Sequence, residues 1–117
     1  MLSFNQFVKT NTLLESTETR LKDVATVKTN YPEADYWLIR KGSQQKVGSV
    51  TKEFNPEHIG VKINRTDILD PQYHYYMMMN LHHQKFWANH SHGVLKLQNI
   101  KTSDVANLKF TSNGMTL

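Results

Sequence analysis

The sequence predicts an α+β fold: a small, twisted and mostly antiparallel sheet, one main helix at about residues 71–87 packed on it, and an N-terminal helical arm. Apolar and polar residues alternate over His58–Asn64, as in a strand with one buried face. Asp70-Pro71 is typical of a helix start, and helical spacing follows it. The length of 117 residues fits one domain, and the absence of cysteine excludes a disulfide framework.

Residues 1–34 are expected to form the N-terminal arm. The segment is polar, and the spacing of Phe4, Phe7 and Val8 predicts a short amphipathic helix. A second helix is expected from the apolar residues Leu14, Leu21 and Val24. Because the run at 29–32 contains Asn and Pro, it reads as a break, and the folded domain is predicted to span residues 35–117.

The domain is predicted to begin with a β-hairpin. Tyr36–Arg40 is rich in aromatic and branched residues, and Lys46–Lys52 is expected to return as the second strand. The polar residues 42–45 between them predict a four-residue loop. In the strand at 58–64, Ile59, Val61 and Ile63 should face the core, and Gly60 and Lys62 should face outward.

The main helix is predicted to start with Asp70 as its N-cap and Pro71 in its first turn, and to end near Trp87. Its buried face is expected to carry the residues spaced four apart, which are Tyr73, Met77 and Leu81. Beyond a break at Asn89–Gly93 the sequence predicts three more elements, a strand at Val94–Gln98, a helical turn capped at 102–104 and a last strand at Leu108–Phe110.

Positive charge is concentrated in the predicted domain. The net charge of the chain is +4, but residues 1–35 carry four Lys or Arg against five acids. Residues 36–66 carry six Lys or Arg against two acids, and residues 71–117 carry four lysines against Asp104 alone. Such a distribution attracts polyanions.

The order of motifs resembles the target recognition domain of type I restriction specificity subunits. The runs that carry the resemblance are Tyr36-Trp37-Leu38-Ile39-Arg40-Lys41-Gly42-Ser43, Lys46-Val47-Gly48, Ile59-Gly60-Val61-Lys62-Ile63, Leu69-Asp70-Pro71-Gln72-Tyr73-His74-Tyr75-Tyr76, Gly93-Val94-Leu95-Lys96-Leu97 and 100–108. The resemblance covers roughly residues 36–110 and implies a twisted α/β domain that reads duplex DNA. The long helices that join two such domains in that family are not visible here, so a stand-alone, shortened version is expected.

The residues of the predicted hairpin suit DNA contact. Lys and Arg neutralise phosphates, and Gln pairs with adenine edges in the major groove. The predicted DNA-binding residues are Arg40, Lys41, Ser43, Gln44, Gln45, Lys46, Lys62 and Arg65. The prediction requires these side chains to converge on one exposed surface; the alternative is a solvated turn with protective lysines.

The N-terminus has a second resemblance, to head and internal proteins of large tailed phages, carried by Met1-Leu2-Ser3-Phe4-Asn5-Gln6-Phe7. Leu13-Leu14-Glu15 before Ser16 is similar to the site cut by their prohead protease. The resemblance implies a capsid-targeting segment removed between Glu15 and Ser16, and a location in the host cytoplasm or in the virion. The alternative is an ordinary terminal helix.

Other functions are alternatives to DNA binding. One alternative is a phage inhibitor that binds a host restriction or defence protein, and another is a packaged virion internal protein. Three consecutive methionines, Met77–Met79, must face different directions, which indicates a homodimer or partner contact as a further option. No run reaches the roughly 18 apolar residues that span a bilayer, so no membrane contact is predicted.

Enzyme and metal signatures are poor. The sequence has neither a phosphate-binding glycine loop nor a Gly-x-Ser-x-Gly motif, so a non-enzymatic protein without a cofactor is predicted. His90 and His92 are the candidate metal ligands, but no carboxylate lies nearby in the sequence to orient their rings, and no metal site is predicted. The aromatic and methionine residues of the main helix suit either core packing or a platform for stacked bases, and core packing is favoured.

Overall fold

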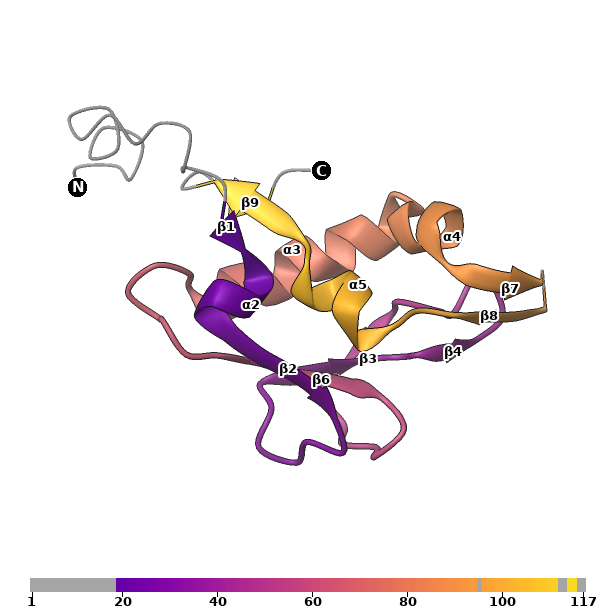
Figure 1. The fold of residues 1–117 in the computed structure, drawn as a ribbon, viewed down its shortest axis with the longest axis horizontal. Coiled ribbons are helices and arrows are strands. Elements are labelled where there is room, and N and C mark those ends of the chain that lie inside the picture. The colour runs from indigo at the N-terminus through magenta and orange to yellow at the C-terminus, as the bar shows by residue number, and fades with distance from the viewer. Residues whose placement is uncertain (1–18, 95, 112–113, 116–117) are drawn as a thin grey trace.

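The computed structural model describes residues 19–94, 96–111 and 114–115 (Figure 1). Over these residues the fold is α+β, as the sequence predicts: short antiparallel strands form three small sheets, and four helices lie among them. Within the same residues, no helix combines the length and apolar character needed to span a membrane.

The central sheet has four strands in the order β2–β6–β3–β5, and all neighbours are antiparallel. The strands are β2 (Ala25–Thr29), β6 (Ile59–Ile63), β3 (Tyr36–Leu38) and β5 (Val50–Thr51). Val61 of β6 lies opposite Val27 of β2 and Tyr36 of β3. The prediction for β6 is confirmed for Ile59, Val61 and Ile63, which are all buried. It is wrong for Gly60, which was placed on the outer face but is buried beneath Tyr31 and Trp37.

The predicted boundary at residue 34 is wrong for the part of the arm that the structure describes. Residues 25–29 form β2 and pair with β6 along their whole length, and Leu21 and Val24 belong to the core. Tyr31 packs over β6, where a Cβ on Gly60 would lie 2.9 Å from the Tyr31 side chain. The physical reason is that β6 is a central strand with two edges, and β3 pairs with only one of them.

The two ends of the described chain form a small sheet of their own. Its strands are β1 (Thr19–Arg20), β9 (Lys109–Thr111) and β10 (Gly114–Met115), with β9 in the middle. The short helix α2 (Leu21–Val24) leads from this sheet into β2. The helix predicted around Phe4 and the cleavage site at Glu15 and Ser16 precede β1, outside the described residues, and both stay predictions.

The predicted hairpin is confirmed in its pairing and wrong in its loop. Trp37 of β3 lies opposite Thr51 of β5, but Arg40–Val47 separates the paired segments in place of a four-residue turn. Within that connection, β4 (Lys41–Gly42) leaves the central sheet and joins a third one. The third sheet has the order β4–β8–β7, with β7 at His92–Val94 and β8 at Leu97–Asn99. The single strand predicted at Val94–Gln98 is therefore wrong, because the chain reverses there.

The main helix starts as predicted and ends earlier. In α3 (Pro71–His83) the carboxylate of Asp70 accepts a hydrogen bond from the Tyr73 amide at 2.8 Å, which caps the helix. Lys85 adopts a left-handed conformation with φ of 67°, and this residue separates α3 from α4 (Phe86–His90). The expected end near Trp87 is therefore wrong. A further short helix, α5 (Thr102–Ala106), lies where the sequence predicts a helical turn.

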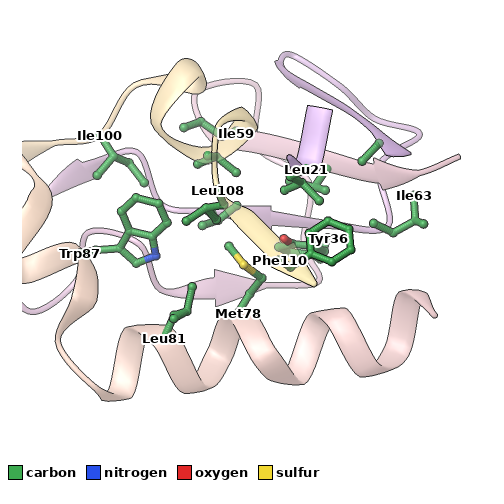
Figure 2. Packing of buried hydrophobic residues seen from close by; sticks show 14 of the residues in the cluster. Leu21, Tyr36, Ile59, Ile63, Met78, Leu81, Trp87, Ile100, Leu108 and Phe110 are labelled. Atoms are coloured by element: carbon green, nitrogen blue, oxygen red, sulfur yellow. The ribbon is translucent and has the colours of Figure 1, made fainter. Parts of the chain in front are cut away.

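The core lies between α3 and the strands, and Met78 and Leu81 point from α3 toward Leu108 (Figure 2). Burial of side chains of this size contributes roughly 1.5–3 kcal/mol each. The face that α3 buries matches the prediction in part: Leu81 is buried and Met77 packs half-buried against the core, but Tyr73 is 46% exposed. The other buried residues of the helix are His74 and Met78. Core packing, which the sequence favours for the methionines of this helix, is found for Met78, the residue after the predicted Met77.

A buried polar pair joins α3 to the central sheet. The Tyr36 hydroxyl and Nε2 of His74 form a hydrogen bond of 2.8 Å, and both side chains are fully buried. Burial lowers the pKa of His74 to about 4, since the charged imidazolium would lose its hydration. Burial, and then the nearby Asp35 carboxylate, raises the pKa of Tyr36 well above its ordinary value. Both groups are therefore neutral near pH 7.

His74 makes the fold sensitive to acid. The unfolded chain takes up a proton on this side chain near pH 6.5 and the folded chain only near pH 4, so the folded state loses about 3 kcal/mol as the pH falls between these values. His74→Gln should remove this part of the pH dependence in urea unfolding at pH 7 and pH 4.5. His83→Gln, at an exposed helix position, is the matched control and should keep it. Equal acid sensitivity in wild type and His74→Gln would contradict the assignment.

Candidate functional site

Arg40 and Lys62, two of the predicted DNA contacts, are paired with acidic residues. The Arg40 guanidinium donates from Nε to the Glu57 carbonyl at 3.0 Å, and its Nη2 lies 3.4 Å from Oε1 of the same residue. Lys62 Nζ lies 3.8 Å from Oδ1 of Asp35. Each positive charge is thus balanced locally, which weakens its attraction for a phosphate.

Arg65 is paired more closely still. Its Nη2 and Nε atoms contact the two oxygens of Asp67 at 2.7 and 3.0 Å. The hydrogen bonds from Arg65 hold the pKa of the Asp67 carboxyl below its ordinary value, so this acid stays charged. The requirement that all predicted cations converge as free charges on one surface is therefore not met by Arg40, Lys62 or Arg65.

The remaining predicted residues do come together, with Lys41 in β4 and the others in the loop of residues 43–48 that follows it. Lys41, Gln45 and Lys46 are exposed, and no residue in the described part of the chain pairs with either lysine side chain. The loop is a tight turn in which the Ser43 carbonyl accepts hydrogen bonds from the amides of Lys46 and Val47, both at 3.0 Å. The Val47 side chain is fully buried and holds the turn against the core.

Two hydrogen bonds hold this loop against the junction of α3 and α4. The Gln44 side-chain amide donates to the Ala88 carbonyl at 3.2 Å, and Nε2 of His82 lies 2.7 Å from the Gln45 carbonyl. Gly48 follows with φ of +83°, and a Cβ there would lie 2.2 Å from the ring of Trp87. Only glycine can bring the loop this close to the indole.

A cavity of about 430 Å³ opens between the loop and the junction. Its lining residues are Gln44, Gln45, His82, His83, Lys85, Ala88 and Asn89. They supply amide, imidazole and ammonium groups and no carboxylate. Such a lining donates hydrogen bonds and suits an anion or the edge of a nucleobase.

The cavity belongs to a larger surface that we call the basic end, made of residues 41–48, 82–89, 92–94 and 96–99. Figure 1 shows β4, β7, β8 and α4 together at one end of the molecule. The sequence has no Asp or Glu between residues 36 and 52 or between 71 and 103, so both segments that form this end lack acids. It carries Lys41, Lys46, Lys85 and Lys96.

The α3–α4 junction is part of the site, although the sequence does not indicate it. Lys85 and Asn89 line the cavity because the helix breaks at Lys85, whereas a continuous helix to residue 87 was expected. The absence of acids from residues 71–103 is visible in the sequence. The loop that completes the cavity, at Gln44 and Gln45, lies some 40 residues earlier in the chain. The proximity of the two depends on the tertiary fold.

The two candidate metal ligands are engaged separately. Nδ1 of His90 donates to the Phe86 carbonyl at 2.7 Å, and its ring stacks on Phe86 with centroids 4.2 Å apart. Nε2 of His92 lies 3.2 Å from Oδ2 of Asp104. Among the residues that the structure describes, no three His, Cys, Asp or Glu side chains gather into a potential metal site.

The fold is of the kind found in specificity subunits of restriction systems. A similar solved structure is the S subunit of a type I restriction-modification system from M. genitalium, with a TM-score of 0.59 and 19% sequence identity. The match covers 82% of this chain and 34% of the S subunit, so the chain spans about a third of that protein. No protein-family model and no curated protein matches the sequence. The resemblance to the target recognition domain of restriction specificity subunits is thus confirmed at the level of the fold.

The contact between Gly48 and Trp87 predicts a specific sensitivity to mutation. Gly48→Ala should destabilise the protein by about 2 kcal/mol or more, because it combines an unfavourable φ with a clash against a buried ring. Gly42→Ala is the matched control, since its φ is also positive but the nearest atom to a new Cβ is 3.6 Å away. Urea unfolding of both variants measures the difference. Equal losses would show that the Trp87 contact does not limit this position.

Proposed function

We propose that this chain binds duplex DNA through its basic end and does not catalyse a reaction. The observation that carries the proposal is the joining of two acid-free segments, distant in sequence, into one surface with four lysines and an amide-lined cavity. The likeness in fold to a restriction specificity subunit supports it. Duplex DNA is the polyanion that matches both the charge and the base-edge chemistry of the surface.

In this proposal the lysines and the amides have different roles. Lys41, Lys46 and Lys85 contact phosphates, which gives affinity without sequence preference. Gln45 and Asn89 at the cavity face base edges and supply sequence preference. Three of the cations that the sequence predicts as DNA contacts, Arg40, Lys62 and Arg65, contribute little to DNA affinity. Their neighbouring acids repel the same phosphates.

A binding role fits the cavity better than a catalytic one. Its lining contains no carboxylate and no hydroxyl nucleophile, and Nε2 of His82 is already engaged by the Gln45 carbonyl. His83 and Lys85 have no carboxylate in the lining to orient or activate them, and a set of hydrogen-bond donors of this kind suits recognition. The acid-free surface with its cluster of lysines also favours DNA over a host protein as the partner.

The proposal predicts which lysines determine DNA affinity. Lys46→Gln and Lys85→Asn should each weaken binding to a mixed-sequence duplex and lower the salt slope by about 0.9, because each removes one phosphate contact. Asn suits the left-handed conformation at position 85. Fluorescence anisotropy across a salt series measures both quantities.

Two controls make this test specific. Lys22→Gln removes the same charge from an exposed position of α2. This helix packs with β1, β2 and α5, outside the basic end, so the salt slope should stay unchanged. Arg65→Gln removes a cation that Asp67 neutralises and should have a smaller effect than Lys46→Gln. Absence of DNA binding even at low salt would refute the proposed function, and equal losses at Lys22 and Lys46 would refute its location.

A further inference from the structure

The β7–β8 hairpin ends in an exposed apolar pair. Val94 and Leu97 lie directly opposite each other in the antiparallel register. Their exposed fractions of 70% and 65% are large for apolar side chains in a folded domain. Side chains opposite each other in such a pair share one face of the hairpin, with Cβ atoms about 5 Å apart. The two therefore form one apolar projection at the tip.

The backbone beneath this projection is held in place. Gly93 has φ of +109°, and a Cβ there would lie 2.4 Å from the Leu97 carbonyl oxygen, so the strands approach closely. Gln98, which is buried, accepts a hydrogen bond from the Ser91 hydroxyl at 2.5 Å and donates to the Val94 carbonyl at 2.6 Å. A tip fixed in this way loses little conformational entropy when it binds.

The same face of this sheet is polar and basic behind the tip. His92 and Lys41 both lie opposite Asn99 in the register, two residues along the strands from the apolar pair. Lys96 is exposed in the turn itself. Asp104 contacts His92 and the Lys101 amide, so its carboxylate is engaged at the far end of the face from the tip. The surface thus changes from apolar at the tip to cationic around it.

We propose that this tip inserts Val94 and Leu97 between base pairs of bound duplex DNA, while Lys41 and Lys96 contact the flanking phosphates. The inference rests on the proposed function and adds a deformation of the DNA to it. A two-stranded ribbon fits a DNA groove, and apolar side chains inserted between base steps unstack and kink the duplex. The hairpin follows α4 directly in the chain, and β7, β8 and α4 lie at the same end of the molecule (Figure 1).

A protein partner fits the tip less well. A stable protein interface buries about 800 Å² on each side, far more than two aliphatic side chains supply. In a contact between the same ends of two copies, the lysines beside the tip would also lack matching acids, because this end of the chain has none between residues 71 and 103. DNA supplies both the apolar stacking surface and the negative charge.

Unwinding of closed-circular plasmid tests the inference without knowledge of a target sequence. Inserted side chains untwist DNA, so relaxation by a topoisomerase in the presence of wild-type protein should shift the topoisomer distribution. The double variant Val94→Ser and Leu97→Ser should lose the shift and keep DNA affinity within about threefold, since the lysines remain. Ile68→Ser, an exposed apolar position on the β6–α3 connection, is the matched control and should keep the shift.

The outcomes separate this inference from the proposed function. DNA binding by wild type without a topoisomer shift overturns the inference and leaves the function in place, whereas no DNA binding overturns both. A change of oligomeric state in the double variant, without loss of the shift, also overturns it and identifies a protein contact. If the double variant fails to fold, Leu97→Trp gives the second measurement: its exposed indole should be quenched on DNA binding by stacking, and unchanged fluorescence would overturn the inference.

Discussion

The packing of Gly48 against the indole of Trp87 determines how the rest of the candidate site is arranged. Trp87 lies in the core beside Phe86, with ring centroids 4.8 Å apart, and fixes where α4 starts relative to the strands. Gly48 reaches the ring because it lacks a Cβ and adopts a positive φ. The loop before Gly48 therefore lies against the α3–α4 junction, where Gln44 and Gln45 form one side of the cavity lining. Together with the hydrogen bonds of Gln44 and His82 and the pairing of β4 with β8, this contact joins the two acid-free segments into one surface.

Local signals in the sequence predict the parts of the fold whose energetics are local. The cap formed by Asp70 and Pro71 and the alternation in β6 are encoded within a few residues, and both are found as predicted. The place of β2 in the central sheet and the exchange of β4 into a third sheet depend on partners distant in the chain. A short β-branched segment such as Ala25–Thr29 carries little pattern of its own, so its pairing is visible only when β6 offers a free edge.

The distribution of charge along the sequence predicts that the folded part is basic, but it does not predict which cations are free to bind a ligand. The sequence correctly indicates that positive charge lies in the folded part, but it does not reveal that Arg40 and Lys62 have acidic partners. Glu57 is 17 positions from Arg40, and Asp35 is 27 positions from Lys62, so neither ion pair follows from local spacing. Exposed ion pairs of this kind add little to stability. Their main consequence here is to neutralise Arg40 and Lys62 on the surface that the sequence predicts to bind DNA.

The distribution of acids, more than the net charge, therefore decides where a polyanion would bind. A chain with a net charge of +4 spread evenly would attract DNA weakly and without orientation. Here Glu57, Asp35 and Asp67 neutralise cations around the central sheet, while Lys41, Lys46, Lys85 and Lys96 have no such partners among the described residues. The field is thereby directed toward one end of the molecule. That end also carries the amide-lined cavity and the apolar hairpin tip, so charge brings a duplex to the place where shape and hydrogen bonding can act on it.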